Sequence, residues 1–183
     1  MPAQTHSFFF ESKRLIGIPL TVADYAEFAR GKEPLWPDFS NPYKHLIEGP
    51  NPLIHRIPRV RQNPTFAEIG IVLAVEKSNR IIIGSAGFHD FPDSRGMIEI
   101  GFGIVPEMQN KGYGTELLQG MWKAICGKPE AKILRYTVSP DNAPSLHIIE
   151  KLGFERVGEQ IDPEDGLELI YEQSVEIFTS GGR

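Results

Sequence analysis

The chain is short of cysteine, of long apolar runs and of clustered positive charge. Cys126 is the single cysteine among 183 residues, which excludes an internal disulfide and any zinc site built from several cysteines. There is no apolar run of about 18 residues and no basic leader followed by an apolar segment, so neither a membrane span nor a secretory signal is indicated. We therefore expect a cytoplasmic protein without a membrane partner.

The charge balance limits the partners further. Nineteen basic residues stand against 24 acidic residues, for a net charge of −5, and the basic residues form no long run. Nucleic-acid binding loses its main electrostatic support. A polyanionic ligand then has to be held by local N–H groups and not by the field of the whole protein. We predict no metal site and no nucleic-acid partner.

One stretch of the chain changes from strand periodicity to helix periodicity. Residues 97–105 are mainly β-branched, aromatic or glycine, as in a strand. Later apolar residues recur at helical spacing: Leu117, Leu118, Met121, Trp122 and Ile125. A strand is therefore expected to run into the start of a helix here.

The join between this strand and this helix carries glycines. Gly112 and Gly114 can adopt positive φ and have no Cβ to keep a ligand away. The first N–H groups of a helix lack internal partners and lie at its positive dipole end. The sequence thus predicts an anion cradle for a phosphate-bearing ligand, formed by Gln109, Asn110, Lys111, Gly112, Tyr113, Gly114 and Thr115.

The sequence of residues 109–115 does not match the motifs of other phosphate-binding loops. The P-loop pattern is absent, and the dinucleotide pattern fails because Leu117 stands where its third glycine belongs. Gln-x-x-Gly-x-Gly remains, a pattern that would also suit a flexible lead-in to a helix.

A second motif follows about 30 residues later: Asn142 and Ser145, then Lys-Leu-Gly-Phe at residues 151–154. Helix capping by Asn142 and Gly153 is the simpler explanation of that motif.

The two motifs, at this spacing, resemble those of the GNAT-type N-acetyltransferases, closest to the branch of ribosomal-protein alanine acetyltransferases. The resemblance is strongest over residues 69–178. It implies an α/β (α+β) GNAT fold: a mixed, mainly antiparallel sheet of six to seven strands, flanked by about four helices and splayed at the cofactor strand. We expect one acetyltransferase domain, 1–183, with an acceptor-side region, 12–66, and an acyl-CoA-binding core, 67–178.

The resemblance also implies acetyl-CoA as the acyl donor, with no metal. Its pyrophosphate would lie on the loop at 109–115, the Phe102 N–H would polarise the thioester carbonyl, and Ile104 would bond the pantetheine. Asn142 and Ser145 offer amide and hydroxyl groups to the same arm. Glycine in the strand sequence Gly101-Phe102-Gly103 suggests a bulge.

Glu99 is the candidate general base, because burial near the bulge would raise its pKa. Strand alternation equally allows it to face solvent, and His89 is a second candidate base. The tyrosine acid of many family members is replaced by Ile149. Either the thiolate leaves unaided, Tyr136 or Ser139 assists, or the protein binds acyl-CoA without turning it over.

Three functions are therefore in competition. The first is an acetyl-CoA-dependent N-acetyltransferase that acts on a primary amine, either a small molecule or a peptide N-terminus. The second is a non-catalytic acyl-CoA-binding or regulatory module. The third is a nucleotide-binding protein, which would prefer ADP. The acidic turn at 162–165 suits a cationic acceptor or is simply solvated, and we expect a monomer or a homodimer.

Local signals also place the remaining elements. Strands are predicted at 13–21, 69–76, 80–89, 132–138, 154–160 and 167–178, and helices at 22–30 and 143–152. Seven prolines in 31–66 argue against long regular elements there, with one short helix expected at 41–48. An edge position is expected for the strand containing Gly17 and Pro19.

Overall fold

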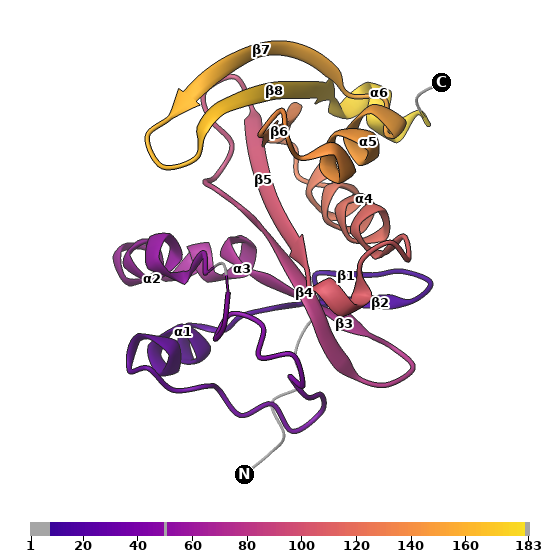
Figure 1. Cartoon of the computed structure of the whole chain (residues 1–183). Helices are drawn as coiled ribbons and strands as arrows, with labels where there is room; N and C mark the ends of the chain where they lie inside the picture. The colour runs from indigo at the N-terminus through magenta and orange to yellow at the C-terminus, as the bar shows by residue number, and fades with distance from the viewer. Residues whose placement is uncertain (1–7, 50, 182–183) are drawn as a thin grey trace. The chain divides into compact units, whose positions relative to one another are not determined.

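The computed structural model describes residues 8–49 and 51–181 (Figure 1). Its eight strands belong to a mixed, mainly antiparallel sheet: β1 (Phe10–Glu11), β2 (Leu15–Pro19), β3 (Val72–Glu76), β4 (Ile81–Phe88), β5 (Met97–Ile104), β6 (Ile133–Val138), β7 (Glu155–Asp162) and β8 (Gly166–Ser174). The helices are α1 (Val22–Ala29), α2 (Leu53–Gln62), α3 (Ala67–Gly70), α4 (Tyr113–Cys126), α5 (Ala143–Lys151) and α6 (Val175–Thr179), with 3-10 turns η1 (Pro64–Phe66) and η2 (Pro106–Met108).

The described residues fall into two compact units. Of these residues, unit 1 contains those up to Gly87 and Phe102–Met121, and unit 2 contains Phe88–Gly101 and those from Trp122 onward. Strands β4 and β5 and helix α4 each pass from one unit into the other along the chain. The predicted division into 12–66 and 67–178 stays a prediction.

Unit 1 contains an antiparallel meander in the order β1, β2, β3, β4. The apolar content of β2 and β3 leaves nearly every residue of these strands buried, as expected for strands covered on both faces. Strand β2 is not at the edge, contrary to the prediction, because β1 pairs with it at Gly17 and Ile16. Thr21 and Asp24 form a capping box that starts α1 where the sequence predicts a helix.

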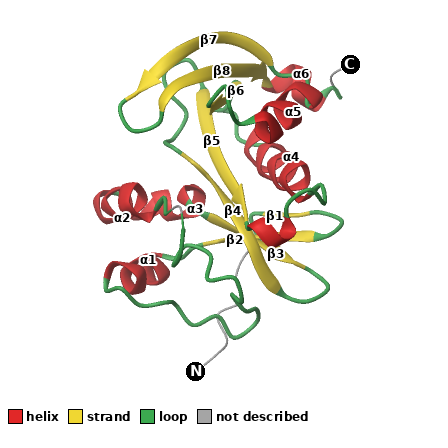
Figure 2. Ribbon diagram, in the orientation of Figure 1, coloured by secondary structure: helices red, strands yellow, loops and turns green. Residues whose placement is uncertain are grey.

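The proline-rich part of unit 1 departs most from prediction. No helix forms at 41–48, because Lys44 and Leu46 have positive φ and the Asn41 side chain accepts the His45 N–H at 2.9 Å; the segment is drawn as loop in Figure 2. A ten-residue helix, α2, forms instead and accommodates Pro58 in its interior. Residues 69–70 end helix α3, so the strand predicted from residue 69 begins at Val72.

Unit 2 contains the other half of the strand order, β5, β6, β8, β7. Strand β6 pairs in parallel with β5 and antiparallel with β8, and β7 and β8 form the predicted hairpin. Trp122 is fully buried and its ring stacks on Phe154 at a centroid distance of 4.5 Å. The strand predicted to reach residue 178 ends at Ser174, whose hydroxyl caps α6 by accepting the Ile177 N–H.

The parallel ladder between β5 and β6 is short. It pairs Met97, Ile98 and Glu99 with Ile133, Leu134 and Arg135, although β5 runs on to Ile104 and β6 to Val138. The bulge predicted at Gly101-Phe102-Gly103 stays a prediction. In addition, no helix among the described residues is long and apolar enough to cross a membrane.

Candidate active site

The turn from β5 into α4 lies within unit 1 and is built on two left-handed residues. Asn110 has φ +59° and Gly112 has φ +78°. A side chain is strained in this region of backbone space, which glycine enters freely. The sequence therefore places glycine at one of the two positions where the turn needs it.

The start of α4 leaves backbone donors open. The Glu116 N–H donates to the Gly112 carbonyl, four residues back, at 3.2 Å. The N–H groups of Tyr113, Gly114 and Thr115 come before Glu116 in the first turn of the helix, where N–H groups lack such a partner. In the part of the chain that the structure describes, no side chain accepts from these three groups. Unpartnered N–H groups at the positive end of a helix suit an anionic ligand.

Gln109 and Lys111 shape the loop from within. The Gln109 side-chain amide donates to the Ile104 carbonyl at 2.9 Å, and the Lys111 ammonium donates to the Glu107 carbonyl at 2.8 Å. Both bonds fold the loop back onto the end of β5 and onto η2. The Lys111 ammonium also donates to Met108 Sδ at 3.6 Å, which leaves its third hydrogen for a ligand.

Strand β5 offers room beside this loop. A Cβ built on Gly103 would meet no atom within 4 Å. Gly103 lies between Phe102 and Ile104, whose backbone groups the resemblance assigns to the acyl arm. Open space at this point and open N–H groups at α4 both fit a phosphate-bearing ligand with an extended arm.

Glu99 occupies a half-buried position in unit 2. Its neighbours Ile98 and Ile100 are each 1% exposed and face the core, so Glu99 takes the opposite face of β5. Its side chain is 18% exposed. Thr137 Oγ1 donates to Glu99 Oε1 at 2.6 Å, which holds one carboxylate oxygen in place.

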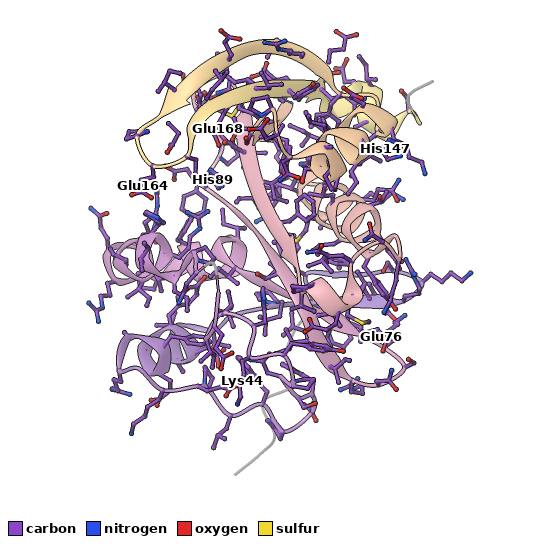
Figure 3. All side chains as sticks on the ribbon, viewed as in Figure 1. Lys44, Glu76, His89, His147, Glu164 and Glu168 are labelled. Atoms are coloured by element: carbon purple, nitrogen blue, oxygen red, sulfur yellow. The ribbon has the colours of Figure 1, made fainter. Side chains whose placement is uncertain are left out.

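His89, labelled in Figure 3, directly follows β4. The His89 N–H donates to the Glu99 carbonyl at 2.9 Å, which makes the two residues cross-strand neighbours. Their side chains meet with His89 Nδ1 3.4 Å from Glu99 Oε1. The imidazole also covers Gly101, because a Cβ there would lie 3.0 Å from His89 Nε2. The two candidate bases are thus brought together.

The start of α5 is closed by its own side chains. Asn142 Oδ1 accepts the Ser145 N–H at 3.2 Å, and Ser145 is 8% exposed. Tyr136 is buried, which raises the pKa of its phenol; a hydrogen bond with Ser145 lowers that pKa and the charge of Glu168 (Figure 3) raises it further. The phenol therefore keeps its proton at neutral pH.

The position at which the resemblance implies a tyrosine acid is part of the core. Ile149 is fully buried, so it packs the helix against its unit and contributes no proton donor. Ser139 Oγ accepts the Asp141 N–H at 3.3 Å, which is a local turn contact. Asp162 Oδ1 likewise accepts the N–H groups of Glu164 and Asp165, so the acidic tip is held as a turn.

Two contributors to these sites carry no sequence signal. Thr137 is an ordinary residue of a half-buried strand, and only the parallel register of β5 and β6 brings it to Glu99. Arg14 lies about 100 residues before the loop, yet its guanidinium donates to the Lys111 carbonyl at 2.9 Å. No cluster of His, Cys, Asp and Glu suited to a metal ion occurs among residues 8–49 and 51–181.

Comparison with known proteins gives a family match over most of the chain. The model of the acetyltransferase (GNAT) domain matches residues 14–155. The chain is 35% identical over 82 residues to the uncharacterized N-acetyltransferase YjdG of Bacillus subtilis, covering 45% of this chain and 49% of that protein. It spans about half the length of the curated relatives that it matches.

Solved structures of low sequence identity share the fold. The ribosomal-protein-S5-alanine acetyltransferase of Vibrio fischeri superposes with a TM-score of 0.64 at 14% identity, covering 92% of this chain and 97% of that one. RimL, a ribosomal-protein acetyltransferase solved in complex with coenzyme A, gives a TM-score of 0.65 at 12% identity, covering 92% and 98%.

Proposed function

Because the chain belongs to the GNAT acetyltransferase family, we propose that it is an N-acetyltransferase that transfers the acetyl group of acetyl-CoA to a primary amine. The open N–H groups at the start of α4, reached through the left-handed Gly112, are the observation that carries this proposal. A cytoplasmic location and a monomeric or homodimeric state complete the proposal as predictions.

The loop at 109–115 is proposed to hold the pyrophosphate of acetyl-CoA. The N–H groups of Tyr113, Gly114 and Thr115 lie at the start of the helix, and the ammonium of Lys111 adds a positive charge to the same loop. Gln109 and Asn110 contribute by fixing the turn. These groups bind the anion without the overall field of the protein, which is negative.

The backbone of β5 is proposed to hold the acyl arm. Peptide-like ligands bind exposed strand edges through main-chain hydrogen bonds, and the ladder of β5 with β6 ends at Glu99. The Phe102 N–H would donate to the carbonyl that becomes an oxyanion, and Ile104 to the pantetheine. One such donor contributes about 10²-fold to 10³-fold in rate. Acetyl-CoA itself supplies an activated thioester.

Glu99 is proposed as the group that accepts the amine proton. Thr137 occupies Oε1, which leaves Oε2 for the incoming amine or a bridging water. A carboxylate fixed in this way is a positioned base. On the leaving-group side, Tyr136 and Ser139 are both proposed as groups that could assist the thiolate: burial raises the pKa of the Tyr136 phenol, so it carries its proton at neutral pH, and Ser139 Oγ accepts the Asp141 N–H, which leaves its own hydrogen to donate.

The acceptor is proposed to be a primary amine of a peptide N-terminus or of a small molecule. The structural relatives include ribosomal-protein acetyltransferases, whose fold the present chain shares. Asn142 and Ser145 are proposed to contact the pantetheine arm with the groups that capping leaves available, above all the Asn142 Nδ2.

Calorimetric titration with acetyl-CoA, CoA and ADP in parallel tests this function, followed by a thiol-release screen of amines with the same protein. Binding of acetyl-CoA together with amine-dependent release of CoA is the expected result. Binding without release by any amine would favour the non-catalytic acyl-CoA module, for which the buried Ile149 is the motivating observation. Tighter binding of ADP than of acetyl-CoA would favour a nucleotide-binding protein.

A further inference from the structure

The segment that leads into β2 contacts the first turn of α4 within unit 1. Glu116 Oε1 accepts both the Arg14 N–H at 2.7 Å and the Ser12 hydroxyl at 2.8 Å. Glu116 Oε2 accepts the Nε–H of Arg14 at 2.6 Å. One carboxylate in the helix start is thus bound by three donors from a segment about 100 residues away.

The same guanidinium touches three successive residues of the loop. Arg14 Nη1 donates to the Lys111 carbonyl at 2.9 Å. A Cβ built on Gly112 would lie 3.5 Å from Arg14 Nη2, and the guanidinium carbon is 4.1 Å from the centre of the Tyr113 ring. Ion pair, hydrogen bond and cation–π contact therefore all fix one side chain against the loop.

These contacts orient a backbone donor. In a trans peptide the C=O of one residue and the N–H of the next point in opposite directions. Because the Lys111 carbonyl faces Arg14, the Gly112 N–H of the same peptide unit points away from Arg14. Arg14 thereby orients the Gly112 N–H, which is followed along the chain by the N–H groups of Tyr113 and Gly114.

Arg14 also compensates a charge that opposes anion binding. Glu116 is an acidic residue in the first turn of α4, and its side chain is 15% exposed. Partial burial by itself raises the pKa of Glu116, but the hydrogen bonds from Arg14 and Ser12 outweigh burial and lower that pKa below its ordinary value. The carboxylate is ionised at neutral pH, and without Arg14 it would repel a phosphate bound at the same helix start.

We propose that Arg14 is a positioning residue of the cofactor loop: it aims the Gly112 N–H at the pyrophosphate and neutralises Glu116. The proposal rests on the proposed binding of acetyl-CoA and adds to it a residue outside the loop motif. It makes anion binding by α4 depend on a side chain from the entry to β2.

The first test is calorimetric binding of three ligands to Arg14→Ala: acetyl-CoA, ADP and S-acetylpantetheine, which lacks the pyrophosphate. We expect the Kd to rise about 10-fold to 100-fold for acetyl-CoA and ADP, the range for losing charge-assisted hydrogen bonds. For S-acetylpantetheine we expect less than about a twofold change, since it has no phosphate to receive a charge-assisted hydrogen bond. Arg30→Ala is the matched control, because Arg30 pairs with Glu27 on the exposed end of α1.

A charge-cancelling pair separates this role from support of the fold. Glu116→Gln keeps a hydrogen-bonding side chain and removes the charge. In the Arg14→Ala background it should recover about 3-fold to 10-fold of the lost ADP affinity, because neighbouring charges couple. Arg14→Lys keeps the charge but has one donor group in place of the guanidinium fork, so its Kd should lie between those of the wild type and Arg14→Ala. Circular dichroism confirms that each variant is folded.

Unchanged Kd values for acetyl-CoA and ADP in Arg14→Ala and Arg14→Lys would overturn the proposal. So would equal weakening of all three ligands, or a double variant no better than Arg14→Ala, since both outcomes indicate general damage. Failure of the proposed function gives a different result: ADP binding would depend on Arg14 as expected, while no amine released CoA from acetyl-CoA.

Discussion

Two helix starts that the sequence singled out have opposite hydrogen-bonding states. At α5 the Asn142 side chain accepts the Ser145 N–H, and Ser145 is buried. At α4 no side chain of the described residues accepts from Tyr113, Gly114 or Thr115. One start is therefore satisfied by the protein itself, and the other is left open to a ligand.

The difference follows from which residue precedes each helix. Asparagine before α5 brings its own acceptor, whereas Gly112 before α4 has no side chain and adopts a φ that directs the backbone outward. The comparison predicts two classes of variant. Changes at open groups should alter binding or turnover with little effect on stability, and changes at satisfied groups should do the reverse.

The largest effect is expected at Glu99, the proposed base, whose Oε2 is left for the amine. Glu99→Gln should lower kcat by about 10²-fold to 10⁴-fold, because the amide cannot accept the amine proton. The Kd for acetyl-CoA should stay within about twofold of the wild type, since Glu99 is assigned to the acceptor and not to the cofactor. Steady-state kinetics and calorimetry on the same sample measure both.

Thr137→Val is the companion variant, because it removes the hydroxyl that holds Glu99 Oε1 and keeps the shape of the side chain. A loss of about tenfold in kcat is expected, the worth of one oriented hydrogen bond. An unchanged rate in Glu99→Gln would eliminate Glu99 as the base and direct attention to His89.

A side-chain acceptor placed before α4 would remove the difference between the start of α4 and the start of α5. Gly112→Asp supplies an acceptor to the first turn of α4 and places a negative charge where the pyrophosphate is proposed to bind. The Kd for acetyl-CoA should rise by at least about 100-fold, because like charges in contact cost several kcal/mol. Gly112→Asn is the uncharged control, and both residue types tolerate positive φ.

Charge repulsion predicts a clear difference between these two variants in calorimetric titration. Equal, small changes in both would show that the anion does not lie at Gly112.

The pair His45 and Ser85 belongs to the satisfied class and gives a prediction for pH. His45 Nε2 lies 2.8 Å from Ser85 Oγ, and burial lowers the pKa of His45 from 6.5 to about 4. As the pH falls below 6.5 the unfolded chain takes up a proton that the folded chain refuses until about pH 4. The free energy of unfolding should therefore drop by about 1–2 kcal/mol between pH 7 and pH 5.

Urea unfolding at the two pH values measures this drop, with His45→Gln as the variant that cannot titrate. The variant should show a smaller pH dependence than the wild type over the same interval. Equal slopes would assign the pH dependence to other groups.

The smallest effect is expected at the start of α5. Asn142→Ala removes the cap and should cost about 1 kcal/mol of stability, while the Kd for acetyl-CoA should change by less than about fivefold, the worth of one neutral hydrogen bond. Asn142→Asp keeps an acceptor for the Ser145 N–H and loses the Nδ2 donor. Thermal unfolding and calorimetry of the two variants separate capping from a contact with pantetheine. A larger loss of affinity would show that the start of α5, like that of α4, contributes to ligand binding.

The success of prediction varies along the chain for a physical reason. Helix α4 was predicted with its buried face, because Leu117, Leu118 and Met121 recur at 3.6-residue spacing and all become buried. The region 31–66 was mispredicted, because its signals were local: Pro42 after Asn41 suits a helix start. Longer-range contacts decide there, since the Asn41 amide also donates to Glu33 at 2.9 Å.

The extra elements were missed for a similar reason. Among the described residues the sheet has eight strands where six to seven were expected, and six α-helices occur where about four were expected. Strand β1 has only two residues and exists because it pairs with Ile16 and Gly17. A segment of this length carries no periodicity that a sequence can display.

The sequence by itself determined the order of the main strands and helices and the glycine turn into α4, while it left open whether Glu99 is buried or faces solvent. These follow from side-chain periodicity and from backbone preferences, both of which act over a few residues. Only the tertiary structure decided that Thr137 reaches Glu99, that His89 covers Gly101 and that Arg14 reaches the loop. Such contacts join residues that are distant in the chain, and the register of the strands, not their composition, brings them together.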